Sequence, residues 1–162
     1  MFTYYMPTQV FFGKGCIAES GQVLADLGKR ALLVTGRHSA KVNGSQDAFT
    51  GKLDELGISW YLFDDVENNP SIDTIRRAAA FAKEKGVDFV VGIGGGSPMD
   101  AAKAIALLCT DDLDDEQLFK GPYKKPLPIV AVPTTAGTGS EVTKVSVLTT
   151  FMPGPSSPSI RL

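Results

Sequence analysis

Short apolar runs alternate along this chain with segments in which apolar residues recur at helical spacing. Four of the runs are rich in β-branched and aromatic residues, which is typical of buried parallel strands. They lie at Ala31–Thr35, Ser59–Phe63, Val87–Ile93 and Ile129–Val132. The pattern therefore predicts a sheet of four core strands.

Helical periodicity occupies the intervals around these runs. The predicted helices are Cys16–Leu27, Asp47–Leu56, Ser71–Lys85 and Ser97–Cys109, and a glycine follows each of the first three. Strands that alternate with helices indicate an α/β fold with a doubly wound parallel sheet. The sequence VFFG at 10–13 predicts an edge strand or hairpin attached to that sheet.

The end of the chain differs in character from the rest. The stretch FMPGPSSPSIRL at 151–162 has no periodicity and contains three of the ten prolines. We expect one domain over residues 1–150 and an irregular tail over 151–162. Two explanations of the tail stay open: an ordinary loose C-terminus, or a non-native end where the natural sequence was interrupted.

Composition narrows the function classes. The chain has 162 residues, 43% of them hydrophobic and 21% charged, with a net charge of −2, which is ordinary globular usage and argues against a nucleic-acid partner. One histidine, His38, and two distant cysteines cannot build a His- or Cys-rich metal site. We expect a reduced, cytoplasmic protein with no membrane span and no signal peptide.

The glycine-rich segment at 92–103 is the most informative motif. Gly94, Gly95 and Gly96 follow a predicted strand, and Ser97 and Asp100 are spaced as a capping box at the start of the next helix. Free backbone amides and the helix dipole make such a start an anion site, suited to a phosphate or pyrophosphate. The Walker and G-x-G-x-x-G patterns are both absent. The alternative is a glycine turn that only permits tight packing of strand on helix.

Two further loops follow predicted strands and would share the same edge of the sheet. The loop at 133–143 offers the hydroxyls of Thr134, Thr135 and Thr138, although an ordinary surface loop remains an alternative.

The second of these loops follows the first core strand. It carries Gly36, Arg37, Ser39 and Lys41, where small, hydroxyl and cationic groups would accept a 2′-phosphate. The alternatives are a solvated basic turn and, for His38, a surface histidine without catalytic role.

These motifs together resemble the iron-containing (group III) alcohol dehydrogenase family. The resemblance rests on GGGSPMDAAKAIA at 94–106 and PTTAGTGSEVT at 133–143, supported by VFFGKG at 10–15, LVTGRHSAKVNGS at 33–45 and Asn69-Pro70. It covers residues 1 to about 150 and is strongest for NADP-preferring, butanol-dehydrogenase-like members. It implies a Rossmann-like cofactor domain that is followed in the family by a helical domain.

The resemblance also implies roles for individual residues. The pyrophosphate would lie on Gly94, Gly95, Gly96 and Ser97, with the threonines at 134, 135 and 138 around the phosphates and nicotinamide. Asn69 would lie near the adenosine half. An aspartate at the position of Gly36 marks NAD users, so Gly36 suggests NADP. Asp100 and Lys103 match the motif, and Asp100 ranks below the glycines because it is explained equally well as a helix cap.

The family's metal ligands, one Asp and three His, belong to the helical domain, so no metal ligand and no catalytic residue is assigned here. We expect this chain to be the NADP(H)-binding half of an alcohol dehydrogenase, inactive alone and without bound Fe or Zn. The alternatives are a non-catalytic dinucleotide-binding or dimerisation module, and a relative of glycerol dehydrogenase or dehydroquinate synthase. Self-association, with residues 1–12 pairing across a two-fold axis to form a homodimer, is expected as well.

Overall fold

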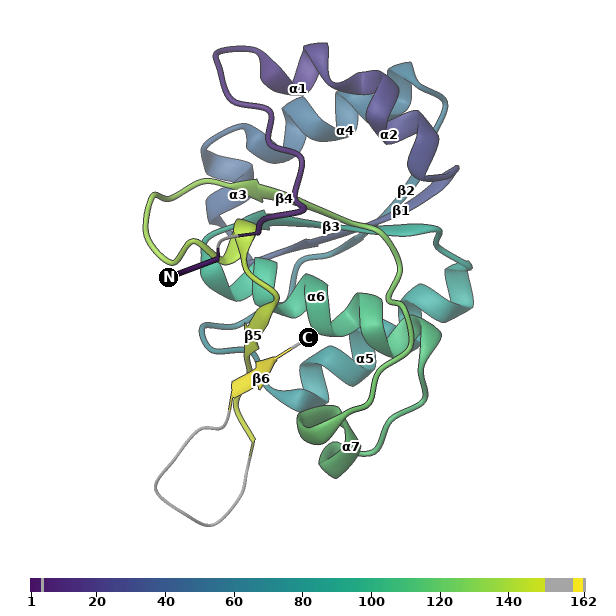
Figure 1. Cartoon of the computed structure of the whole chain (residues 1–162). Helices are drawn as coiled ribbons and strands as arrows, with labels where there is room; N and C mark the ends of the chain where they lie inside the picture. Colours follow the sequence, from purple (N-terminus) through teal and green to yellow (C-terminus); the bar gives the residue numbers. More distant parts are fainter. Residues whose placement is uncertain (4, 151–158, 162) are drawn as a thin grey trace.

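The computed structural model describes residues 1–3, 5–150 and 159–161 of the chain. Its main element is a parallel sheet with strand order β2-β1-β3-β4 (Figure 1). The strands are β1 (Arg30–Thr35), β2 (Ser59–Phe63), β3 (Phe89–Gly94) and β4 (Ile129–Pro133). The central strands β1 and β3 are buried almost throughout, which confirms the reading of their apolar runs as core strands.

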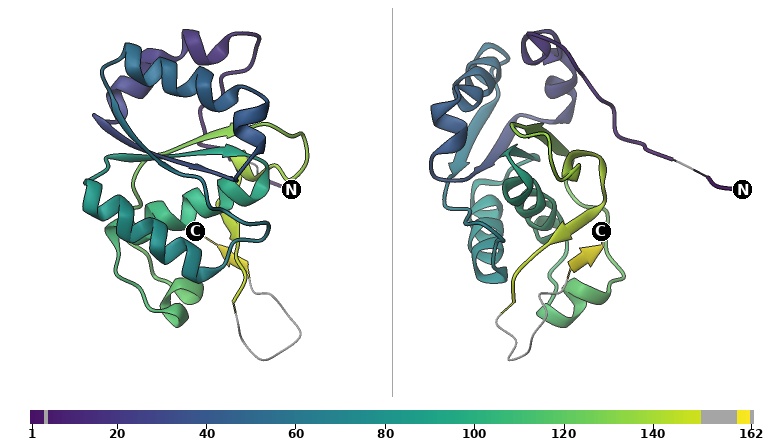
Figure 2. Two further views of the ribbon diagram at one scale, coloured as in Figure 1. Left: turned by 180° about the vertical axis from the view of Figure 1, so that it is seen from behind. Right: turned by 90° about the vertical axis from the view of Figure 1, so that its left-hand side faces the viewer.

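Helices cover both faces of the sheet, as a doubly wound fold requires (Figures 1 and 2). One face carries α1 (Cys16–Glu19), α2 (Gly21–Leu27), α3 (Ser39–Val42) and α4 (Ser45–Glu55). The other carries α5 (Ile72–Lys85), α6 (Gly96–Thr110) and α7 (Asp115–Lys120). Each face has its own apolar core, because alternate residues of β1 and β3 point to opposite sides. None of the described helices is long and apolar enough to cross a membrane.

Local signals explain most element boundaries. Helix α5 begins after Ser71, whose hydroxyl accepts a bond from the Thr74 amide, and ends at Gly86 with φ 59°. Strand β3 starts two residues later than predicted. The Val87 amide still bonds to Ala82 O at the end of α5, and the Asp88 carboxylate accepts bonds from the amides of residues 29 and 30.

Two expectations at the element level are wrong, and two short helices were not predicted. The predicted helix Cys16–Leu27 is two helices, because the Ser20 hydroxyl bonds back to Cys16 O at 2.6 Å and the chain turns there. Helix α7 was not predicted, although the capping box of Asp114 and Gln117 is a signal that could have found it. The short helix α3 was not predicted either.

The second wrong expectation is the strand or hairpin at 10–13. The described residues of 1–12 contain no strand, and this segment extends away from the body of the molecule (Figure 2). Its large apolar side chains are exposed, with Phe12 100% accessible. An extended segment becomes a strand only when a neighbouring backbone pairs with it.

The chain after β4 returns to the helical face that holds α5 and α6. It passes through a short 3₁₀ helix, η1 (Ser140–Val142), and β5 (Val145–Val147), which pairs antiparallel with β6 (Ser159–Arg161). Thr149 then bonds to Pro70 O and Ile72 N just before and at the start of α5. Three residues of the expected irregular tail are therefore in a strand, and residues 151–158 and 162 lie outside the described part.

Candidate functional site

The topology creates a crevice at the carboxyl ends of β1 and β3. After β1 the chain turns to α3 and α4 on one face, and after β3 it turns to α6 on the other. Neighbouring strands whose connections leave in opposite directions mark the point where open α/β sheets bind ligands. The glycine loop after β3 and the loop at 36–41 after β1 both lie at this point, as predicted from the sequence.

The start of α6 is open to an anion. Its N-cap is Gly95, and no side chain caps the amides of the first turn. The expected capping box is wrong, because the N-cap is Gly95, two residues before Ser97. The hydroxyl of Ser97 instead accepts a bond from the Asn69 amide at 3.2 Å, which joins the loop after β2 to the glycine loop.

The glycine and threonine loops lie against each other, as the adjacency of β3 and β4 predicts. The Thr134 amide bonds to Gly94 O at 2.9 Å. A Cβ on Gly95 would lie 3.4 Å from Thr135 Oγ1, and a Cβ on Gly96 would lie 2.8 Å from Thr138 Cγ2. Gly96 therefore has no room for a side chain, whereas Gly95 borders space between the loops.

The close packing of strand β3 on helix α6 depends on another glycine, Gly92. A Cβ on Gly92 would lie 3.0 Å from Ala102 Cβ and 3.1 Å from Met99 Cα, so this glycine lets β3 pack closely on α6. A structural requirement thus explains Gly92, and it also explains Gly94, which has φ 144° and where a Cβ would lie 2.9 Å from Pro98 Cγ. It does not explain Gly95, whose backbone angles of −82° and −160° any residue could adopt.

Behind the loops, Asp100 and Lys103 form a buried ion pair. Asp100 Oδ1 accepts bonds from Ser140 Oγ at 2.5 Å and from Lys103 Nζ at 3.3 Å, and its Oδ2 accepts a bond from the Val147 amide at 3.1 Å. The side chains of Asp100 and Lys103 are 13% and 8% exposed. Asp100 is therefore not the helix cap considered from the sequence, but an anchor for the segment after the threonine loop.

Lys103 contributes further bonds to the segment that Asp100 anchors. Its ammonium donates to Ser140 Oγ at 2.6 Å and to Val145 O at 2.7 Å. Burial lowers the pKa of Lys103, and the Asp100 carboxylate opposes that shift. The sequence interpretation gave Lys103 and Ser140 no role. The signal was a lysine on an otherwise apolar helical stretch, three residues after an aspartate.

A cleft of about 410 Å³ lies over this anchor. It brings together five of the residues predicted to bind a cofactor: Asn69, Gly96, Ser97, Asp100 and Thr138. Its remaining lining consists of Pro70, Ser140, Thr143, Val145 and Val147. Asn69 has φ 55°, a left-handed conformation that places it at the turn between β2 and α5.

The loop after β1 is not the free basic turn that the sequence suggested. The guanidinium of Arg37 bonds to Asp65 Oδ1, and Lys41 Nζ bonds to Asp64 Oδ2 at 2.8 Å. The hydrogen bond from Arg37 is the largest cause of a lowered pKa of Asp65, and the same pair raises the pKa of Arg37. Both predicted cations thus face carboxylates that follow β2, which periodicity along the chain could not reveal.

The other residues of this loop carry less information. Gly36 is partly buried, Ser39 is exposed at the start of α3, and His38 is exposed without capping that helix. The placement of His38 agrees with its interpretation as a surface residue.

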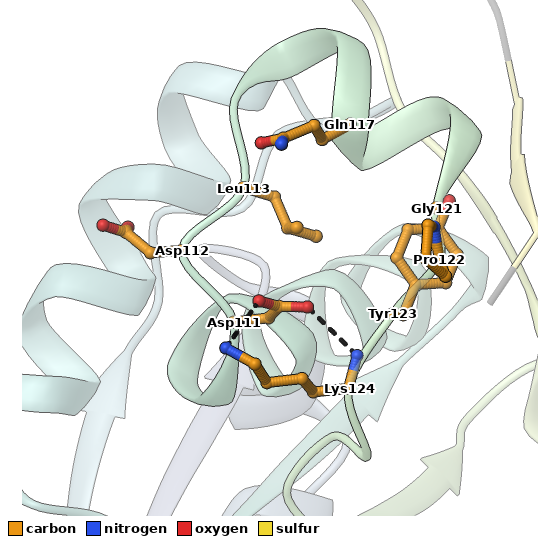
Figure 3. A pocket seen from close by; sticks show the side chains of 8 residues that line it. All are labelled: Asp111, Asp112, Leu113, Gln117, Gly121, Pro122, Tyr123 and Lys124. Atoms are coloured by element: carbon orange, nitrogen blue, oxygen red, sulfur yellow. Dashed lines mark hydrogen bonds and ion pairs between the residues drawn. The ribbon is translucent and has the colours of Figure 1, made fainter.

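A second pocket lies at the opposite end of the sheet, among the end of α6, helix α7 and the segment before β4 (Figure 3). Its one well-buried carboxylate, Asp111, accepts bonds from the Lys124 amide at 3.0 Å and pairs with Lys124 Nζ at 3.1 Å. That carboxylate is already paired, and the other carboxylate of the lining, Asp112, is fully exposed to solvent. We take the crevice at β1 and β3 as the candidate site.

The described residues do not fit a protein-bound iron or zinc ion. They contain no group of three or more His, Cys, Asp or Glu side chains that could hold a metal. His38 is the single histidine of the sequence, and it is far from sufficient for such a site.

Comparison with known proteins decides the family. Residues 7–152 match the family described as iron-containing alcohol dehydrogenase. The chain belongs to this family. A crystal structure of an iron-containing alcohol dehydrogenase from Thermotoga maritima superposes with a TM-score of 0.87 at 51% identity, covering 92% of this chain and 42% of that one.

Curated relatives in the iron-containing alcohol dehydrogenase family differ in their cofactor. NADH-dependent butanol dehydrogenase A of Clostridium acetobutylicum is 41% identical over 149 residues, which are 91% of this chain and 38% of the relative. NADPH-dependent butanol dehydrogenase of Clostridium saccharobutylicum is 33% identical over 156 residues, 93% of this chain and 39% of the relative. The chain thus spans well under half the length of the relatives it matches.

Proposed function

We propose that this chain is the NADP(H)-binding half of a metal-dependent alcohol dehydrogenase. The whole enzyme would transfer hydride between an alcohol–aldehyde pair and NADP. The observation that carries the proposal is the uncapped start of α6 between the glycine and threonine loops, at the carboxyl edge of the sheet. Amides aimed at a common space and nearby hydroxyl donors suit a pyrophosphate. The butanol dehydrogenases among the relatives support the substrate class.

Each part of the dinucleotide has matching groups along the crevice. The pyrophosphate would bind at Gly94–Ser97, within reach of the hydroxyls of Thr135 and Thr138. Asn69 and Gly36 would border the adenosine half, because they follow β2 and β1. The nicotinamide ring supplies the hydride acceptor when bound. The role of this chain is to hold and orient the cofactor, with Asp100 and Lys103 fixing the loop beside it.

The proposed preference for NADP rests on Gly36. An acidic residue at the end of this strand would repel a 2′-phosphate, and glycine does not. Arg37 and Lys41 lie in the same loop and can supply positive charge. Because named relatives use either NADH or NADPH, the preference has to be measured on this chain.

We expect titration of the chain with NADP and NAD to show tighter binding of NADP. Changing Gly36→Asp will weaken NADP binding about tenfold or more, because a carboxylate would face the 2′-phosphate, and will leave NAD binding at least as strong. The added Cβ would lie 3.5 Å from Val66 O, an ordinary contact, so the fold accommodates it.

Gly36→Asn is the matched control, because it adds the same volume without charge. Equal loss of NADP affinity in both variants would show a steric effect and contradict the role of charge. Failure of the unchanged chain to bind either nucleotide would overturn the proposed function itself.

Because no metal site is found in the described residues, we expect these 162 residues alone to bind the cofactor without oxidising alcohols.

We further propose that the chain forms homodimers through residues 1–12 in a cytoplasmic setting. The segment presents Phe2, Tyr5 and Phe12 to solvent at 83% exposure or more, and its described residues form no strand. Exposed apolar side chains on an extended segment suit pairing with a second copy.

Light scattering should therefore report a dimer, and Phe11→Ser with Phe12→Ser should shift it toward monomer. Val42→Ser is the control, because Val42 is a large apolar residue that is 86% exposed on a different surface, helix α3. A monomer at high concentration before any substitution would contradict the dimer.

A further inference from the structure

Asp65, directly after β2, holds two arginines that come from different elements. Its Oδ1 accepts bonds from Arg37 of the loop after β1, at 2.9 Å from Nε and 2.5 Å from Nη2. Its Oδ2 accepts a bond from Nη2 of Arg77 on α5 at 3.2 Å. One carboxylate is therefore shared by two guanidinium groups, with Asp64 and Glu67 as further negative charges that act on Arg37.

The two arginines differ in the partners that they have besides Asp65. Arg77 also donates to Thr74 Oγ1 at 3.2 Å, and its guanidinium lies 5.9 Å from the centre of the Phe63 ring. Arg37 makes two shorter bonds to Asp65 but no side-chain bond to any other described residue, and its side chain is 72% exposed against 59% for Arg77. Arg37 is thus the arginine that can leave Asp65 for another anion.

The neighbouring ion pair behaves differently. Lys41 pairs with Asp64, one cation to one carboxylate. Moving Lys41 to a ligand would leave Asp64 without that partner, whereas moving Arg37 leaves Asp65 still paired with Arg77. A guanidinium is also the better match for a phosphate, because it donates two parallel bonds.

We propose that Arg37 moves from Asp65 to the 2′-phosphate of NADP, and that Arg77 determines how easily it does so without touching the cofactor. Arg77 is a positioning residue that acts through Asp65: it keeps that carboxylate neutralised once Arg37 has left. The inference rests on the proposed function, because it requires the adenosine ribose at the end of β1. It adds a specificity determinant on α5, distant in sequence from the glycine and threonine motifs.

The test is the dissociation constant of the chain for NADP and for NAD at low ionic strength, measured by calorimetry. Arg37→Gln should weaken NADP binding about tenfold and leave NAD unchanged, since it removes a charged bond to the 2′-phosphate. Arg77→Gln should weaken NADP binding roughly three- to tenfold, because Asp65 then retains Arg37, and should again leave NAD unchanged. Arg77→Lys should restore most of the loss.

A double-mutant cycle separates this role from a general effect of positive charge. In the Asp65→Asn background the carboxylate that retains Arg37 is gone, so Arg77→Gln should have no further effect on NADP. Arg76→Gln, which removes a neighbouring arginine paired with Asp115 instead, is the matched control. Melting temperatures of all variants confirm that they fold.

The outcomes are distinct. Equal weakening of NADP by Arg77→Gln with and without Asp65 would overturn the inference, as would a parallel change for NAD and NADP. Absence of binding by the unchanged chain to either nucleotide would overturn the proposed function and this inference with it.

Discussion

Changing Asp100→Ala will lower the free energy of unfolding of the chain by about 3–5 kcal/mol, the range for breaking a buried ion pair from one side. The variant leaves the Lys103 ammonium, whose side chain is 8% exposed, without its carboxylate. It also removes the acceptor of the Ser140 hydroxyl and of the Val147 amide. The loss combines an uncompensated charge with unsatisfied donors.

Urea unfolding of the chain and its variants measures this effect. Asp112→Ala is the control, because Asp112 is fully exposed and 3.8 Å from Lys83, and it should change stability by less than about 1 kcal/mol. Asp100→Asn keeps a carbonyl acceptor and should lose less than the alanine variant. Similar losses in the Asp100 and Asp112 variants would contradict the anchoring role.

The Asp100→Ala effect should also depend on pH. The folded pKa of Lys103 is already lowered from 10.5 by burial, and loss of Asp100 removes the main influence that opposes the shift. Below that folded pKa the unpaired ammonium destabilises the variant. As pH rises through it toward 10.5, the unfolded chain binds more protons than the folded one, so the stability of the variant increases relative to wild type.

Changing Gly95→Val will abolish most dinucleotide binding, with a loss of about 100-fold, while the chain remains folded. The backbone of Gly95 permits a side chain, and its Cβ would lie 3.4 Å from Thr135 Oγ1. Further atoms would fill the space between the two loops and block the approach of a pyrophosphate to the α6 amides. Loss of two charge-assisted bonds accounts for the magnitude.

Calorimetric titration with NADP, alongside thermal unfolding, distinguishes lost binding from lost folding. Gly51→Ala is the control, because Gly51 lies on the exposed side of α4 with no atom within 4 Å of a new Cβ. It should bind as the wild type does and be slightly more stable. Unchanged affinity in the Gly95→Val variant would place the phosphates elsewhere.

Several features of the fold could be predicted because they depend on neighbours in the sequence. The apolar run of β1 and the Ser71–Gly86 boundaries of α5 are local signals, and the structure confirms them. The meeting of the glycine and threonine loops follows from their place after consecutive strands of a parallel sheet. The prediction of Ser97 as the cap was wrong because a helix start can shift by one or two residues at little energetic cost among glycines.

The sequence by itself determined the four core strands, the longer helices between them, the doubly wound class and the glycine and threonine motifs, because hydrophobic period and glycine placement act over a few residues. Only the tertiary structure decided the partners of the charged groups. Asp100 meets Ser140 and Val147 across 40 and 47 residues, and Arg37 meets Asp65 across 28. Such pairs form where distant segments are brought together by burial of the two apolar cores, and no local pattern encodes that distance.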